Sequence, residues 1–288
     1  MKQIRIKGDK GLIEKIISRF LFIFTLLFLI SYFIIIAYPL FWMVFSSFKD
    51  TASIFGETWS LPREWNMDNF KEAWNLGISD YFLNSVIVTS LTILITVIFS
   101  AFAAFGLSRY KFKGQNILFL IIAGGLMFSP EVSLIPLYKI VQFFKIYDTH
   151  WALILPYVAF QIPLTVLLFR AHFITIDKEY EESAYLDGCT SIGFLWRIVI
   201  PMSMPIVLTA TVLISFFAWN EFMFSLVFLD TDSLKTIPTG LLAFQGAVST
   251  NWGVMMAGLT ISALPIVILF LFTQRYFISG LAEGGLKS

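Results

Sequence analysis

Three polar side chains are candidates for chemistry because they lie within long apolar stretches of the sequence. Glu131 follows Pro130 in one stretch, and Asn220 and Glu221 lie together near the end of another. Ionisable groups inside a bilayer are costly, so they mark candidate functional sites. Two interpretations stay open. These groups could hydrogen-bond the hydroxyls of a solute on a substrate pathway, or they could tie helices together, and we prefer the second.

The sequence contains none of the residue patterns that are typical of catalytic or nucleotide-binding sites. It has no G-x4-G-K-[ST] phosphate loop and no G-x-S-x-G, H-E-x-x-H or Cys-His arrangement. His150 and His172 have no cysteine or carboxylate cluster at a spacing suited to metal ligands. We therefore predict no catalytic residue, no metal site and no cofactor in this chain, which makes it a non-enzyme.

A polar segment, residues 181–201, separates two apolar stretches and reads EESAYLDGCTSIGFLWRIVIP. Residues 175–187 predict a short amphipathic helix, in which Asp177 can cap the first amide groups. Tyr180 and Ala184 fall on one face of this helix because they are four residues apart. Such an element on a membrane protein is typical of a docking site for another protein.

Gly188 separates this helix from a second one. A glycine at this point either adopts the left-handed backbone conformation that ends a helix, or permits a close backbone approach that a side chain would block. The second short helix is predicted to begin near residues 190–191 and to place Phe194 and Ile198 against the bundle. Pro201 is predicted to end it, because proline removes a donor and disfavours helical geometry in the preceding residue.

The amino-acid composition indicates the class of protein in which these residues lie. Hydrophobic residues make up 58% of the 288 positions, charged residues make up 14%, and 32 residues are Phe. An ordinary soluble domain has about half apolar and about a quarter charged residues, so we predict an integral membrane protein. The net charge of +1 argues against a nucleic-acid partner, because such proteins concentrate basic residues against phosphates.

Six apolar segments are long enough to cross a bilayer as helices, which requires about 20 residues each. They are predicted near residues 20–45, 83–107, 116–137, 152–171, 202–229 and 254–277. The first is too long for a signal-peptide core of about 7–15 residues. We predict an all-α polytopic bundle with a basic tail at 1–19 and one transmembrane domain at 20–288.

The positions of Lys and Arg predict the orientation, because the cytoplasmic side carries the excess. Fourteen of the 20 fall in the two terminal segments, the turn after the second predicted span and residues 170–197, and six fall in the other connections. Both termini and the polar segment are therefore predicted to be cytoplasmic. On the outer side we predict a short surface helix near 69–74, a linker at 138–151 and a polar loop at 230–253.

The polar segment resembles the coupling loop of permease subunits in ATP-binding-cassette (ABC) importers, whose pattern is E-A-A-x3-G-x9-I-x-L-P. The matching residues, in one register, are Glu182, Ser183, Ala184, Gly188, Ile198 and Pro201. The sequence departs from the pattern in three ways. Ser183 replaces the first Ala, Ile200 replaces Leu, and Asp177 stands where members often carry a Pro that starts the helix.

Further motifs resemble the carbohydrate-uptake branch of these permeases, in particular the shorter maltose-type subunit. They are Asn84-Ser85, Trp219-Asn220-Glu221-Phe222 and Gln274-Arg275-Tyr276-Phe277-Ile278-Ser279-Gly280. The resemblance implies a sugar importer, of a di- or oligosaccharide, in a bacterial or archaeal cytoplasmic membrane. It implies alternating access, driven by ATP and Mg that the partner ATPase binds. The implied partners are a second homologous permease in a heterodimer, two ABC ATPase subunits, an extracytoplasmic solute-binding protein and membrane lipid.

We call residues 172–201 the coupling segment. The resemblance implies that Glu182 meets a basic side chain in a cleft of the ATPase. The residues predicted to couple the chain to the ATPase are Glu181, Glu182, Ser183, Ala184, Asp187, Gly188, Ile198 and Pro201. A stand-alone secondary transporter or channel is the alternative, and it would be expected to show inverted repeats and an internal ion site. A membrane-embedded enzyme is a third possibility, for which no catalytic constellation can be named.

Overall fold

The computed structural model describes the backbone of residues 3–247 and 251–285 and the side chains of residues 17–242, 244–246 and 251–274. The side chains of the basic tail up to residue 16 and of the 275–280 motif lie outside these ranges. The long helices are α1 (Gln3–Ser46), α4 (Ser79–Arg109), α7 (Trp151–Phe173), α11 (Met204–Asn220) and α14 (Trp252–Gly285). The short helices are α2 (Thr51–Gly56), α3 (Asp68–Ala73), α5 (Gln115–Gly124), α6 (Leu134–Phe143), α8 (Lys178–Leu186), α9 (Ser191–Phe194), α10 (Ile200–Met202), α12 (Met223–Phe228) and α13 (Ile237–Ala247).

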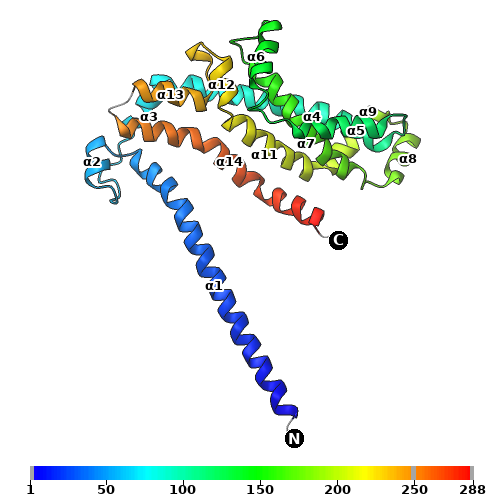
Figure 1. Ribbon diagram of the computed structural model, residues 1–288, viewed down its shortest axis with the longest axis horizontal. Coiled ribbons are helices and arrows are strands. Elements are labelled where there is room, and N and C mark those ends of the chain that lie inside the picture. The colour runs from blue at the N-terminus through cyan, green and yellow to red at the C-terminus, as the bar shows by residue number, and fades with distance from the viewer. Residues whose placement is uncertain (1–2, 248–250, 286–288) are drawn as a thin grey trace.

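The centre of the molecule is a helix bundle in which α4 packs along α7, and α11 contacts both α4 and α14 (Figure 1). Small side chains on the buried face of α4 let these helices approach closely, as is usual between membrane helices. The small buried residues of that face are Ser85, Val88, Thr89, Thr92, Thr96, Ser100, Ala101 and Ala104. The predicted all-α class is confirmed for the described part of the chain, where every regular element is helical.

Among the described residues, four helices are long and apolar enough to cross a membrane: Ile17–Ser46, Asp68–Arg109, Trp151–Phe173 and Trp252–Gln274. A fifth candidate is a bent pair, Ser191–Met202 and Met204–Asn220, whose two parts meet at 82°. The six uninterrupted spans that we predicted are therefore not all present in the described residues. The predicted first, second, fourth and sixth spans correspond to α1, α4, α7 and α14.

The predicted third span is interrupted. Helix α5 continues as a short 3-10 turn, Gly125–Met127, and the chain becomes helical again only at α6. A Cβ on Gly125 would come within 2.7 Å of the Pro163 ring on α7, so a glycine is needed where this helix end approaches its neighbour. Pro130, in the break, cannot donate a backbone hydrogen bond. The predicted fifth span is likewise divided, since α11 ends before the extended Glu221 and α12 follows.

The bundle has two contrasting ends (Figure 1). We call residues 46–78, with α2 and α3, the cap end, and α8 to α10 the coupling end; they lie at opposite ends of the bundle. The predicted surface helix near 69–74 is confirmed as α3, which is followed by a π-helical turn, Trp74–Ile78. At the cap end the Asn69 amide donates to the carbonyls of Ser47 and Lys49, at 2.9 Å each.

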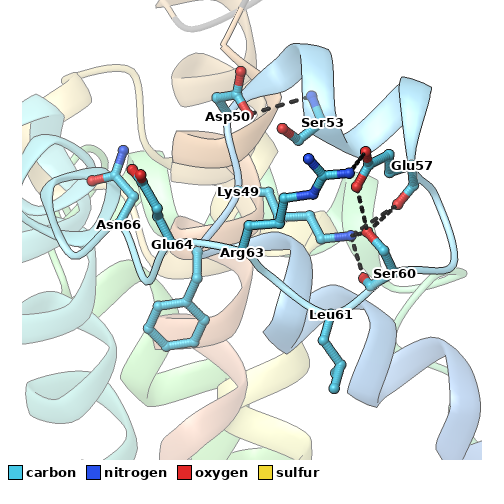
Figure 2. Close-up of a pocket in the computed structure, with 10 residues that line it drawn as sticks. Lys49, Asp50, Ser53, Glu57, Ser60, Leu61, Arg63, Glu64 and Asn66 are labelled. Atoms are coloured by element: carbon cyan, nitrogen blue, oxygen red, sulfur yellow. Dashed lines mark hydrogen bonds and ion pairs between the residues drawn. The ribbon is translucent and has the colours of Figure 1, made fainter.

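Lys49 organises the loop at the cap end (Figure 2). Its side chain is buried, and its ammonium donates to the carbonyls of Glu57 at 3.0 Å and Ser60 at 2.5 Å. Figure 2 shows Arg63 beside it, paired with the Glu57 carboxylate. A pocket of about 290 Å³ lies among these side chains and Asp50. Arg63 pairs with Glu57 at this pocket and Lys49 bonds loop carbonyls, so the pocket is part of a local loop structure.

Two predicted outer connections are wrong. The linker at 138–151 is helical as far as Phe143, because α6 buries Val141 against α7 and α12. The polar loop at 230–253 contains α13, which buries Ile237 and Phe244. Tertiary packing explains this helix, because Gly240 lies so close to Tyr81 that a Cβ there would be 2.3 Å from the ring.

Candidate functional site

The first part of the coupling segment forms the predicted short helix, α8. Its residues divide between two faces: Ala184 is buried against the bundle, whereas Glu182, Ser183 and Asp187 are exposed. Glu179 and Glu181 lie in the first turn, where acidic groups favour the positive end of the helix dipole. Asp177 occupies the N-cap position, but its side chain makes no capping hydrogen bond, so that part of the prediction is wrong.

Gly188 ends α8 in the left-handed conformation that was one of the two alternatives. Its φ is +77°, and a Cβ there would meet nothing within 4 Å, so close approach is not the reason for glycine. The Gly188 amide donates to the Tyr185 carbonyl at 3.0 Å, and the Cys189 amide donates to the Ala184 carbonyl at 2.9 Å. These two bonds are the Schellman pattern, which fixes where the chain leaves the helix.

The second predicted helix begins as α9. Thr190 precedes it, and its hydroxyl accepts a hydrogen bond from the Gly193 amide at 3.2 Å, which caps the first turn. Phe194, Leu195 and Val199 are buried, and Ile198 packs against the same core. The segment is therefore anchored to the bundle by its second helix, as predicted.

Pro201 does not end this helix. A π-helical turn, Leu195–Val199, leads into α10. Pro201 lies in the first turn of α10, where the backbone N–H that proline lacks would have no intrahelical acceptor. The chain instead turns by 82° at Ser203, whose amide donates to the Val199 carbonyl at 2.9 Å. Helix α11 starts beyond it with Pro205 in its first turn. The helix therefore ends at Met202, one residue later than predicted, and the bend follows at Ser203.

The outward surface of the coupling segment contains apolar side chains as well as Glu182. Leu186 is 89% exposed at the end of α8, and Ile192 is 64% exposed at the start of α9. Tyr180 is also exposed, on the first turn of α8. Exposed large apolar groups beside an acidic residue form a surface suited to a protein partner. Our sequence analysis did not single out Leu186 or Ile192. The feature that could have identified them is an apolar residue on the face of α8 or α9 that helical periodicity places away from the bundle.

Tyr185 links the two short helices. Its hydroxyl donates to a Glu181 carboxylate oxygen at 3.1 Å and lies 3.1 Å from the Ser191 hydroxyl. The hydrogen bond with Ser191 lowers the pKa of the Tyr185 phenol, whereas desolvation and the neighbouring Glu181 raise it, and the net change is a rise above the ordinary value. The phenol therefore keeps its proton at neutral pH and holds α8 and α9 in a fixed relation.

Glu181 turns inward rather than toward the exposed surface. One of its oxygens lies 3.6 Å from the guanidinium of Arg109, whose side chain is only 4% exposed. Arg109 ends α4, and our sequence analysis counted it only as a charge that sets orientation. No local pattern indicates this pairing, because the two residues lie far apart in the sequence.

The three polar residues in the apolar stretches do not form one cluster. The Tyr157 hydroxyl on α7 donates to Glu221 at 2.5 Å, and the other Glu221 oxygen accepts from the Phe224 amide at 2.8 Å. Glu221 thus caps α12 and ties it to α7. Asn220 is exposed and donates to the Phe216 carbonyl at 2.8 Å. Glu131 is exposed and accepts from the Ser129 hydroxyl.

The Asn84-Ser85 motif joins the start of α4 to the loop before α13. The Asn84 amide donates to the carbonyls of Ser233 at 2.7 Å and Lys235 at 3.0 Å. The Ser85 hydroxyl accepts from the Ile237 amide at 2.8 Å. Helix α4 therefore runs without interruption from this loop to Arg109 beneath the coupling segment. Within the side chains that the structure describes, no group of three or more His, Cys, Asp or Glu residues could hold a metal ion.

Comparisons with known proteins identify the family to which this chain is similar. The family model described as the inner membrane component of binding-protein-dependent transport systems matches residues 96–283. The probable ABC transporter permease protein YurM of Bacillus subtilis (strain 168) is 56% identical over 260 residues, which cover 90% of this chain and 87% of that protein. The trehalose/maltose transport system permease protein MalG of Thermococcus litoralis is 34% identical over 88% of this chain and 92% of that protein.

A solved structure shows the same fold. It is the crystal structure of a bacterial ABC transporter involved in the import of the acidic polysaccharide alginate. One of its chains superposes with a TM-score of 0.78 over 90% of this chain and 97% of that chain, at 22% sequence identity. At that identity the match supports the fold alone.

Proposed function

The chain belongs to the family of membrane-spanning permease subunits of sugar-importing ABC transporters, and from this premise we propose that its coupling segment is the docking site for an ATPase subunit. The observation that carries the proposal is the geometry of α8: Glu182 and Leu186 face outward while Ala184 anchors the helix to the bundle. The Schellman stop at Gly188 and the Thr190 cap hold this surface in place before any partner binds.

The proposed mechanism is alternating access. ATP binding draws two ATPase subunits together, the docked helices follow, and the helix bundles of two permeases pivot so that a central cavity opens to the other side. Such coupling requires that ATP and the loaded binding protein favour the same global state, because a ligand shifts an equilibrium only through differential affinity. The ATPase subunits bind ATP and Mg, so this chain needs no cofactor for its part of the cycle.

Helix α1 supports the proposal of a second permease. In the most apolar window of Ile17–Ser46 only 6% of the residues are buried, and α1 diverges from the bundle (Figure 1). Its outer end is held at the cap end, where Trp42 donates to the Thr58 carbonyl at 2.9 Å and Tyr38 stacks on Trp59. A spanning helix with so little cover from its own chain is suited to packing against a homologous subunit in a heterodimer.

The remaining finer assignments are proposals of the same kind. The substrate is a di- or oligosaccharide, which is supported by a relative that is a trehalose/maltose transport system permease. Both termini and the coupling segment face the cytoplasm of a bacterial or archaeal cell. The interrupted α5–α6 and α11–α12 pairs complete six spans. An extracytoplasmic binding protein delivers the sugar at the opposite side, where Gln245 on α13 is exposed.

Glu131, Asn220 and Glu221 remain candidates for the sugar pathway. Asn220 and Glu131 are exposed on the isolated chain, so they are free to line a cavity shared with a second permease. Glu221 makes contacts within the chain that suit a structural tie. Uptake by Asn220→Ala and Glu221→Gln complexes over a range of sugar concentrations separates the roles, because a sugar contact changes KM and a structural tie changes the amount of folded complex.

The test is co-purification and transport. The chain is expressed with its genomic neighbours, and the complex is reconstituted to measure uptake over a panel of sugars. Glu182→Lys and Gly188→Asp are expected to release the ATPase while the bundle remains folded. Glu72→Lys is the matched charge reversal, because Glu72 is exposed on α3 at the other end of the bundle. ATPase retained by both coupling variants, or uptake by the chain alone, would overturn the proposal in favour of a stand-alone transporter.

A further inference from the structure

Arg109 is a buried cation at the inner surface of the coupling segment. It is the last residue of α4, and its side chain is 4% exposed. One guanidinium nitrogen, Nη2, donates to the carbonyls of Phe173 and Ile176, at 3.0 Å each. The other, Nη1, lies 3.6 Å from Glu181 Oε2. A buried charge is tolerated only when it is paired and hydrogen-bonded, and the two Nη atoms supply both, whereas the buried Nε has no hydrogen-bond partner among the described residues.

The partners of Arg109 come from different elements. Phe173 is the last residue of α7, where helix carbonyls lack intrahelical donors and cations are favoured. Ile176 lies in the turn before α8, and Glu181 lies in α8 itself. The guanidinium also lies 5.9 Å from the centre of the Phe194 ring in α9. One side chain therefore fixes α4, α7, α8 and α9 relative to one another.

The shape of the arginine side chain matters here. Its planar group presents several donors in a rigid fork, so it can bond two carbonyls and a carboxylate at once. A lysine offers a single ammonium on a flexible stem and cannot hold three partners in the same plane. The arrangement predicts that Lys at this position preserves the charge but not the geometry.

We propose that Arg109 is a positioning residue that transmits displacement of the coupling helix to α4. Helix α8 presents Glu182 and Leu186 outward and Glu181 inward, so a push on its outer surface acts directly on the Arg109–Glu181 pair. Helix α4, which is 31 residues long, then carries the displacement as a continuous rod to Asn84 near its other end, and Asn84 bonds the loop before α13. The inference rests on the proposed docking of an ATPase at α8.

The experiment uses the whole transporter in proteoliposomes, with sugar uptake and ATP hydrolysis measured on the same samples. Arg109→Lys is expected to assemble with the ATPase and to hydrolyse ATP, while the sugar moved per ATP falls by at least about fivefold, the lower end of typical allosteric coupling. Glu181→Gln, which removes the ion pair and leaves the carbonyl bonds, is expected to lower the same ratio less. Glu179→Gln makes the same chemical change at an exposed position of α8 and serves as the control.

The ratio of sugar to ATP distinguishes transmission from simple stability. A wild-type ratio in both Arg109→Lys and Glu181→Gln would overturn the inference. So would a loss of assembled complex in proportion to the loss of uptake, with an unchanged ratio in the complex that remains, because that result describes a structural role. Failure of the proposed function is a separate result, since it would appear in the unmodified complex as an absence of bound ATPase.

Discussion

The two ends of the bundle each contain a buried cation, and the two cations do different work. Lys49 at the cap end bonds carbonyls 8 and 11 residues away in the sequence. Arg109 at the coupling end bonds carbonyls 64 and 67 residues away and pairs with Glu181 beyond them. Lys49 closes a local loop, whereas Arg109 joins helices. The difference indicates that the cap end is held by contacts within its own loop and that the coupling end is held by contacts with the helices of the bundle.

The strongest test of this comparison is Arg109→Ala. The variant leaves Glu181 without its cation and leaves the Phe173 and Ile176 carbonyls without their donor. Removing one partner of a buried pair is costly, and we expect a loss of about 3 kcal/mol in unfolding free energy, the low end because Glu181 is partly exposed. Thermal unfolding of the purified chain in detergent measures it.

The control for this change is Arg197→Ala, because Arg197 is exposed on the π-helical turn of the same segment. It is expected to unfold at the temperature of the unmodified chain. Equal melting temperatures for Arg109→Ala and the unmodified chain would mean that the buried cation does not join the helices, and the contrast between the two ends would disappear.

The second largest effect is expected at the cap end, from Gly253→Ala. A Cβ on Gly253 would lie 2.2 Å from the Lys49 carbonyl oxygen and 2.7 Å from the Asn69 amide nitrogen. Backbone must shift to admit it, and overpacking of this kind costs about 1–3 kcal/mol. Because Asn69 bonds the residues that follow α1, the change is expected to loosen α1 from α14. Faster hydrogen exchange in residues 46–49, with unchanged exchange in α8, is the expected measurement.

Gly56→Ala is the matched control at the cap end, since a Cβ there meets nothing within 4 Å. Exchange in that variant should match the unmodified protein. If Gly253→Ala also loosens α8, the two ends are not independent, and the local character that we assign to the cap end is wrong.

Part of this contrast could be predicted from the sequence. The order of two short helices with Gly188 between them depends on local features. These are the four-residue spacing that places Ala184 on one face of α8, the ability of glycine to adopt the left-handed conformation, and the cap at Thr190. Each acts within a few residues, so the pattern predicts it. The end of the second helix was predicted too early at Pro201, because a proline is also tolerated in the first turn of a helix, which is where Pro201 lies in α10.

The long-range features could not be predicted from the same patterns. Arg109 pairs with residues more than 60 positions away, and no periodicity in either stretch indicates which residues meet. The break after α5 lies where Gly125 meets Pro163 of α7. Helix α13 lies within a segment that was predicted as a polar loop, and Phe244 and Gly240 pack it on other helices. The apolar character of the spans was predicted, and their interruptions were set by contacts.

A third prediction concerns Lys49→Met, which keeps the length of the apolar stem and removes the ammonium. The carbonyls of Glu57 and Ser60 lose a donor, but no carboxylate within ion-pair distance loses its cation, because among the described residues Glu57 pairs with Arg63 instead. A net loss of about 1 kcal/mol is expected, because the two lost hydrogen bonds, at about 1 kcal/mol each, are partly offset by removal of the cost of burying the ammonium. Thermal unfolding in detergent, beside Arg109→Ala, measures it, and a loss as large as that of Arg109→Ala would contradict the comparison.

The smallest effect is expected at the helix caps of the two ends, where two aspartates occupy the same position. Asp50 precedes α2 and accepts a hydrogen bond from the Ser53 amide at 3.3 Å, whereas Asp177 precedes α8 and makes no such bond. Hydrogen bonds from the Ser53 side chain and amide lower the pKa of the Asp50 carboxyl below its ordinary value. The ionised Asp50 carboxylate makes the cap. Its contribution to stability is therefore complete at a pH above the ordinary pKa of an aspartate, and it is lost as the pH falls through the lowered pKa of the folded protein. Asp50→Ala should therefore speed hydrogen exchange at Ser53 at neutral pH, and Asp177→Ala should leave the first turn of α8 unchanged. Equal effects of the two substitutions would show that α8 is capped in solution as α2 is, and would remove this difference between the ends.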